Sequence, residues 1–74
     1  MRHIPPAVFA PILRLSRHHA GISQADLGVE TGLSASIIHR LEKAIRAPRP
    51  AELEALVAAL PMLARVLEDE AVCQ

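Results

Sequence analysis

The chain has 74 residues with equal numbers of basic and acidic side chains, eight of each. This length allows one domain with a modest core, and aliphatic side chains must build that core because Phe9 is the only aromatic residue. No apolar run approaches the ~20 residues of a membrane span, prolines interrupt any signal-peptide pattern at the N-terminus, and the single Cys73 excludes an internal disulfide. We therefore expect an all-α, soluble, cytoplasmic protein that does not enter a membrane.

The neutral total conceals an uneven distribution of charge. Residues 1–50 carry seven basic and three acidic side chains, a net charge of +4, together with all four histidines. Residues 51–74 carry one basic and five acidic side chains, a net charge of −4. A basic half beside an acidic half fits a protein that presents one side to phosphates, although an ordinary mixed surface would also have this composition.

Apolar residues at helical spacing predict a first helix that ends near residue 19. Its expected inner face consists of Phe9, Ile12, Leu13 and Leu15. Pro11 leaves two starting points open. A helix from about residue 7 would contain Pro11 and be kinked by it, whereas a helix from about residue 10 would hold Pro11 in its favourable first turn. Residues 1–6 are expected to form an N-terminal tail.

Two short helices joined by a tight turn are predicted over residues 24–31 and 35–43. Ser23 and Ser34 stand at the N-caps of these helices, and Gly32 supplies the positive φ that the turn requires. The expected inner residues are Leu27, Leu33, Ile38 and Leu41. The outer face of the second helix carries small or polar residues, namely Ala35, Ser36, His39 and Arg40. Two crossed helices with one hydrogen-bonding face have the geometry that enters a DNA major groove.

A basic, proline-containing loop over residues 44–50 separates this pair from two further helices. Pro50, Glu52 and Glu54 suit the start of a helix over residues 51–60, and Pro61 ends it. The last helix, over residues 62–72, has an apolar stripe opposite charged side chains. This stripe, which is either a dimerisation surface or part of the chain's own core, contains Met62, Leu63, Val66 and Leu67.

Several residues between Ile12 and Leu60 stand at the spacing of a known pattern. They are Arg17, the run Gly21-Ile22-Ser23-Gln24, the turn residues Leu27, Gly32 and Leu33, the run Ser34-x-Ser36-x-Ile38-x-Arg40-Leu41-Glu42, and Pro48. This set resembles the helix-turn-helix domain of phage repressors of the Cro/cI type, the Xre family. The resemblance implies a single five-helix, lambda-repressor-like DNA-binding domain over residues 1–74, with the helix-turn-helix at about residues 24–43.

Three positions depart from the family pattern. Gly28 replaces the alanine that packs the two helices together, and Ser16 stands where the family prefers leucine. Ala44 replaces the glycine that normally ends the third helix. Because alanine is strained in the left-handed conformation, we expect the third helix to end differently here.

The resemblance also implies roles for individual side chains. Base contacts fall on Ala35, Ser36, His39 and Arg40, because arginine reads guanine, serine donates or accepts, and a methyl group contacts thymine. Phosphate contacts are expected from the helix start at Ser23 and Gln24 and from the basic residues Lys43, Arg46 and Arg49. The alternative for these basic residues is a merely solvated loop. Arg17 and Glu42 are implied to form a partly buried salt bridge that ties the first helix to the third.

These expectations describe a homodimeric transcriptional regulator, most simply an autorepressor, that binds a palindromic operator in double-stranded DNA. The resemblance implies a setting in phages, plasmids or other mobile elements. The alternative is an antitoxin or other interaction module whose acidic last helix binds a toxin or another regulator as its protein partner.

Nothing in the sequence suggests catalysis or a cofactor. It contains no nucleophile–base set, glycine-rich phosphate loop or pair of carboxylates in a plausible cleft. His18 and His19 are adjacent and point about 100° apart on a helix, so they make a poor metal site. We expect neither an enzyme nor a metal protein.

Overall fold

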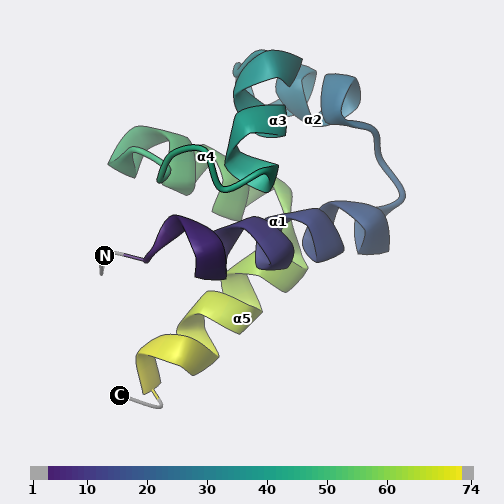
Figure 1. The fold of residues 1–74 in the computed structure, drawn as a ribbon. Helices are drawn as coiled ribbons and strands as arrows, with labels where there is room; N and C mark the ends of the chain where they lie inside the picture. Colours follow the sequence, from purple (N-terminus) through teal and green to yellow (C-terminus); the bar gives the residue numbers. More distant parts are fainter. Residues whose placement is uncertain (1–3, 73–74) are drawn as a thin grey trace.

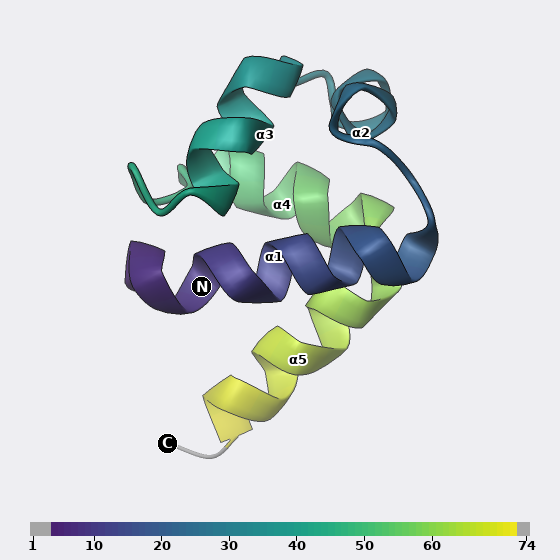
Figure 2. The ribbon, with the colours of Figure 1, turned by 45° about the vertical axis from the view of Figure 1, so that its right-hand side comes forward.

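The computed structural model describes residues 4–72. This part of the chain contains no strand and consists of the helices α1 (Pro6–Ala20), α2 (Gln24–Thr31), α3 (Ala35–Glu42), α4 (Pro50–Ala59) and α5 (Pro61–Val72). α2 and α3 lie on one side of α1 and α5 lies on the other, while α4 packs against α2 and α5 (Figures 1 and 2). The predicted all-α, five-helix fold is confirmed. Cys73 and residues 1–3 of the predicted tail lie outside the described residues.

One hydrophobic core joins all five helices. Its buried members are Phe9, Leu13, Leu27, Ile38, Leu41, Leu53, Leu56, Leu60 and Leu63. Full burial of one such side chain contributes about 1.5–3 kcal/mol, so this cluster is the main source of stability. The inner residues predicted for α3, Ile38 and Leu41, are confirmed. Within residues 4–72, no helix has the length and apolar character needed to span a membrane.

The prediction that Leu15 faces the core is wrong, because its side chain is 61% exposed. Phe9, Leu13 and Ser16 follow one another at i, i+4 and i+7 and form the buried face of α1. Leu15 comes two residues after Leu13 and therefore points about 200° away from it. Ser16 is tolerated in the core because its hydroxyl donates a hydrogen bond to the Ile12 carbonyl oxygen at 2.7 Å.

α1 begins at Pro6 and contains Pro11, so the earlier of the two predicted starting points is correct. The Pro5 carbonyl oxygen accepts two N–H groups of the first turn at 3.0 Å, which makes the chain helical before Pro11. Proline lacks the N–H that would bond the carbonyl four residues earlier. That carbonyl belongs to Ala7, and both residues are exposed, so water can take the place of the missing donor.

Local hydrogen bonds set the boundaries of α2 and α3 as the sequence predicts. Ser23 Oγ accepts the Asp26 N–H at 3.0 Å, and Ser34 Oγ accepts the Ile37 N–H at 3.1 Å. Gly32 follows α2 with a φ of 76°. The angle between the two helices is therefore determined by two caps and one left-handed glycine.

Gly28 lies where α2 comes closest to the turn. A Cβ at this position would lie 2.7 Å from the Leu33 carbonyl oxygen, which is shorter than Cβ contacts found in proteins. Glycine costs about 1 kcal/mol of helix propensity relative to alanine. In return, the backbone of α2 approaches the turn more closely than an alanine would allow.

α3 ends in the way the family pattern describes, although alanine replaces glycine. Ala44 adopts a φ of 60°, and the expectation that this alanine would change the helix end is wrong. The Ile45 N–H donates to the Arg40 carbonyl oxygen at 3.0 Å, and the Ala44 N–H donates to the Leu41 carbonyl oxygen at 3.2 Å. These two bonds close the helix end and hold Ala44 in the left-handed region.

Candidate nucleic-acid interface

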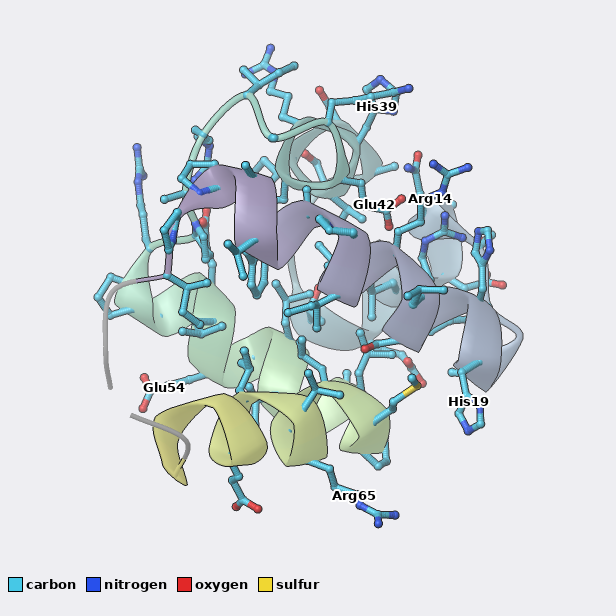
Figure 3. The ribbon with its side chains drawn as sticks, turned by 60° about the horizontal axis from the view of Figure 1, so that its bottom comes forward. Arg14, His19, His39, Glu42, Glu54 and Arg65 are labelled. Atoms are coloured by element: carbon cyan, nitrogen blue, oxygen red, sulfur yellow. The ribbon has the colours of Figure 1, made fainter. Side chains whose placement is uncertain are left out.

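The outer face of α3 is an exposed surface of small and polar side chains within the helix-turn-helix. Ile38 and Leu41 anchor the inner face in the core. Ala35, Ser36, His39 and Arg40, the four predicted base-contact residues, are all exposed. Figure 3 shows His39 projecting away from the body of the molecule. α3 thus offers a short row of side chains on a rigidly packed support.

The structure brings Arg17 and Glu42 together. Arg17 Nε donates to Glu42 Oε2 at 2.6 Å and Arg17 Nη2 donates to Oε1 at 3.0 Å, with side-chain exposures of 12% and 5%. Gln24 Nε2 also donates to Glu42 Oε1, at 3.2 Å. Burial alone would raise the pKa of Glu42, but the hydrogen bonds from Arg17 and Gln24 outweigh it and lower that pKa. One carboxylate therefore ties α1 and the start of α2 to the end of α3.

The predicted phosphate-contact residues differ in their surroundings. Lys43 and Arg49 are exposed, whereas Gln24 is partly buried with its amide directed to Glu42. The Ser23 hydroxyl serves as the N-cap of α2. Arg46 is partly buried in the loop between α3 and α4.

Arg46 pairs with Glu52, a partner that the sequence analysis missed. Arg46 Nη1 and Nη2 donate to Glu52 Oε1 and Oε2, both at 2.8 Å, and the Arg49 N–H donates to Oε1 at 3.0 Å. The hydrogen bond from Arg46 lowers the pKa of Glu52 to about 2, against the opposing effect of burial. The sequence analysis explained the acidic residue in the first turn of α4 by the dipole of that helix alone. It therefore did not predict a basic partner for this residue.

The predicted dimerisation residues of α5 also separate into two groups. Leu63 is fully buried in the core, which agrees with the second of the two alternatives that the sequence left open for this stripe. Met62, Val66 and Leu67 are partly buried. Met62 and Val66 line a groove with Ser16 and His19, between the end of α1 and the start of α5.

Arg14 and His18 are residues that the sequence analysis left without a site. They line a hollow together with Gln24, Glu42 and Lys43 where α1, α2 and α3 meet. Their i, i+4 spacing places both on one face of α1. This spacing was the only indication in the sequence that the two side chains belong to one surface. The partner helices that complete the hollow are visible only in the fold.

A family model described as a helix-turn-helix domain matches residues 9–71 of this chain. The chain belongs to this helix-turn-helix family. The match includes all of α2, α3 and α4 and agrees with the resemblance to Cro/cI-type domains and with a lambda-repressor-like fold. Membership in this family indicates a DNA-binding regulator. Searches of curated proteins and of solved structures gave no significant match.

Proposed function

We propose that this helix-turn-helix protein is a sequence-specific transcriptional regulator that inserts α3 into the major groove of double-stranded DNA. The observation that carries the proposal is the outer face of α3. This face exposes Ser36, His39 and Arg40, whereas the opposite face of α3 is buried in the core. Glu42, the last residue of α3, is held by hydrogen bonds from α1 and α2. A recognition helix needs both properties, because base readout requires exposed donors in a well-defined position.

Each exposed side chain has a chemical role in this proposal. Arg40 reads guanine through two hydrogen bonds, Ser36 and His39 bond to neighbouring base edges, and the Ala35 methyl group contacts thymine. Lys43, Arg49 and the start of α2 at Ser23 and Gln24 contact phosphates. Glu52 neutralises the charge of Arg46, and three of the five N–H groups of Arg46 already bond to Glu52 and Ala47, so we assign its contribution to DNA binding mainly to the shape of the loop.

We further propose that the protein binds as a homodimer to a palindromic operator and represses transcription, including that of its own gene. A recognition surface of four small side chains reads few base pairs. Two copies would double the contacts at half-sites ~34 Å apart. The partly buried apolar residues of α5 are the surface that would join them.

Arg40→Ala tests the assignment of the recognition helix. We expect footprinting on the DNA upstream of the protein's own reading frame to show a protected palindrome with the wild type. In Arg40→Ala we expect a loss of discrimination of about 1–3 kcal/mol, confined to one base position in each half-site. Fluorescence anisotropy with base-substituted duplexes measures this loss.

Arg65→Ala is the matched control, because Arg65 is an exposed arginine on α5 and projects from a different side of the molecule (Figure 3). Its binding should equal that of the wild type. Equal protection by wild type and Arg40→Ala, or the absence of any protected site, would contradict sequence-specific reading by α3.

A further inference from the structure

A polar hollow of about 200 Å³ lies where α1, α2 and α3 meet. α1 contributes Arg14, Arg17 and His18, and α3 contributes His39, Glu42 and Lys43. Figure 3 shows Arg14 beside Glu42, with His39 projecting from the same region, and Arg65 on a different side of the molecule. The hollow therefore lies directly beside the outer face of α3.

The charges around the hollow favour an anion. Arg17 and Glu42 neutralise each other through two hydrogen bonds. Arg14 and Lys43 then remain as net positive charges, and neither takes part in the ion pairs that the structure shows within its described residues. An anion in this hollow would meet two cations and no uncompensated carboxylate.

His18 adds an oriented hydrogen-bond donor. Its Nε2 lies 3.2 Å from Arg17 Nη2, and because a guanidinium group only donates, Nε2 must be the acceptor. With Nε2 as the acceptor, Nδ1 is the ring nitrogen that can donate to a ligand. The contact also restricts the ring, since Arg17 is itself held by Glu42.

We propose that Arg14 and His18 of α1, together with Lys43, bind one phosphate of the DNA backbone in this hollow. The inference rests on the proposed function, because a helix in the major groove has a phosphate backbone along each side. It assigns to α1 a direct part in DNA binding. The contact is independent of base sequence and fixes the angle at which α3 enters the groove.

Arg14→Gln and His18→Ala test the phosphate site by fluorescence anisotropy on an operator duplex and on a random duplex over a series of salt concentrations. Arg14→Gln is expected to weaken binding to both duplexes alike and to reduce the slope of log K against log salt by about 0.9, the effect of one lost phosphate contact. His18→Ala is expected to weaken both about 2- to 10-fold, as for one lost hydrogen bond. Both positions are exposed, and thermal melting checks that the variants fold.

Arg65→Gln is the control for the change in net charge. Because Arg65 lines the α5 groove beside Met62 and Val66, sedimentation velocity checks that this variant keeps the wild-type oligomeric state, and both its affinity and its salt slope should then be unchanged. If the wild type binds DNA and Arg14→Gln has the wild-type slope, the phosphate site is overturned while the proposed function stands. A loss confined to one base sequence would also overturn it, because it would make Arg14 a base reader. If the wild type binds neither duplex even at low salt, both proposals fail.

Discussion

Ala44 is the one non-glycine residue among residues 4–72 with a positive φ. Left-handed backbone costs an L-residue about 1–2 kcal/mol because its Cβ crowds the following carbonyl oxygen. Ala44 accepts this strain because the hydrogen bonds from the Ala44 and Ile45 N–H groups close the end of α3. The backbone of Ala44 also sets the direction of the loop that follows α3, and this loop carries Arg49, one of the proposed phosphate contacts.

Ala44→Gly is expected to stabilise the protein. Relief of the left-handed strain exceeds the greater freedom that glycine has in the unfolded chain, and the net gain should be about 0.5–1 kcal/mol. For a domain of this size, each 1 kcal/mol raises the melting temperature by roughly 4–8 °C, which calorimetry resolves.

Ala58→Gly is the matched control, because Ala58 is an exposed residue within α4. There the same substitution should lower stability by about 1 kcal/mol through helix propensity. If Ala44→Gly lowers the melting temperature as well, Ala44 is not strained in the folded protein.

At the scale of the helices, two carboxylates organise the interface. Glu42 accepts hydrogen bonds from Arg17 on α1 and Gln24 on α2, and so fixes the start of α2 relative to the end of α3. Glu52 holds the other boundary of the interface, since it binds the side chain of Arg46 and the backbone of Arg49. The loop between α3 and α4 is thus attached at both ends before any DNA binds.

Glu52 should make stability depend on pH in the acid range. Its pKa is about 2 in the folded protein, below the ordinary value of 4.5, so the folded state favours the charged form. The stabilisation is complete above the unfolded-state pKa and is lost as the pH falls from about 4.5 toward 2. The side chain is only 10% exposed, and the difference between the two pKa values corresponds to about 3 kcal/mol.

Glu52→Gln is therefore expected to flatten the decline in unfolding free energy across this range, as measured by urea denaturation at several pH values. A smaller decline should remain, because the pKa of Glu42 is also lowered. Glu54→Gln, at an exposed position of the same helix, should keep the wild-type profile. A Glu52→Gln profile parallel to the wild type would show that the Arg46 pair contributes nothing to folding.

At the scale of the whole molecule, the proposed DNA surface and the proposed dimer surface lie on different sides of α1. α2 and α3 lie on one side and α5 on the other (Figures 1 and 2). The sequence places its net positive charge in residues 1–50 and its net negative charge in residues 51–74. Such a charge separation orients the protein as it approaches DNA and turns the acidic end away from the phosphates.

Val66→Glu tests the dimer that we propose. Val66 is partly buried in the groove beside Met62, so a charge there should disrupt an apolar contact between two copies without removing a core side chain. We expect a dimeric wild type and a monomeric variant in sedimentation velocity, and weaker operator binding by the variant. Circular dichroism checks that the variant retains its helices.

Val29→Glu is the control, since Val29 is 85% exposed on α2. It should sediment like the wild type. A monomeric wild type at all concentrations, or a Val66→Glu variant that dimerises as the wild type does, would contradict the use of α5 as the dimer surface.

The sequence by itself determined the helices and the recognition face. Ser23, Gly32 and Ser34 act through hydrogen bonds and backbone angles within a few residues, so the bounds of α2 could be read directly. The inner and outer faces of α3 followed from the period of 3.6 residues, because its apolar residues Ile37, Ile38 and Leu41 fall on one side of the helix. The Arg17–Glu42 contact was predicted from the family resemblance alone. Local sequence patterns could not predict it, because the two residues are 25 positions apart.

Only the tertiary structure decided which side chains meet. Leu15 is exposed and Leu63 is buried, although both are leucines. The way α1 packs against α3 and α5 determines which apolar residues of each helix face the core. The Arg46–Glu52 pair depends on the path of the loop, and the hollow of Arg14 and His18 depends on three helices converging. Helical periodicity specifies the faces of each element, but contacts between elements are set by packing across the whole core.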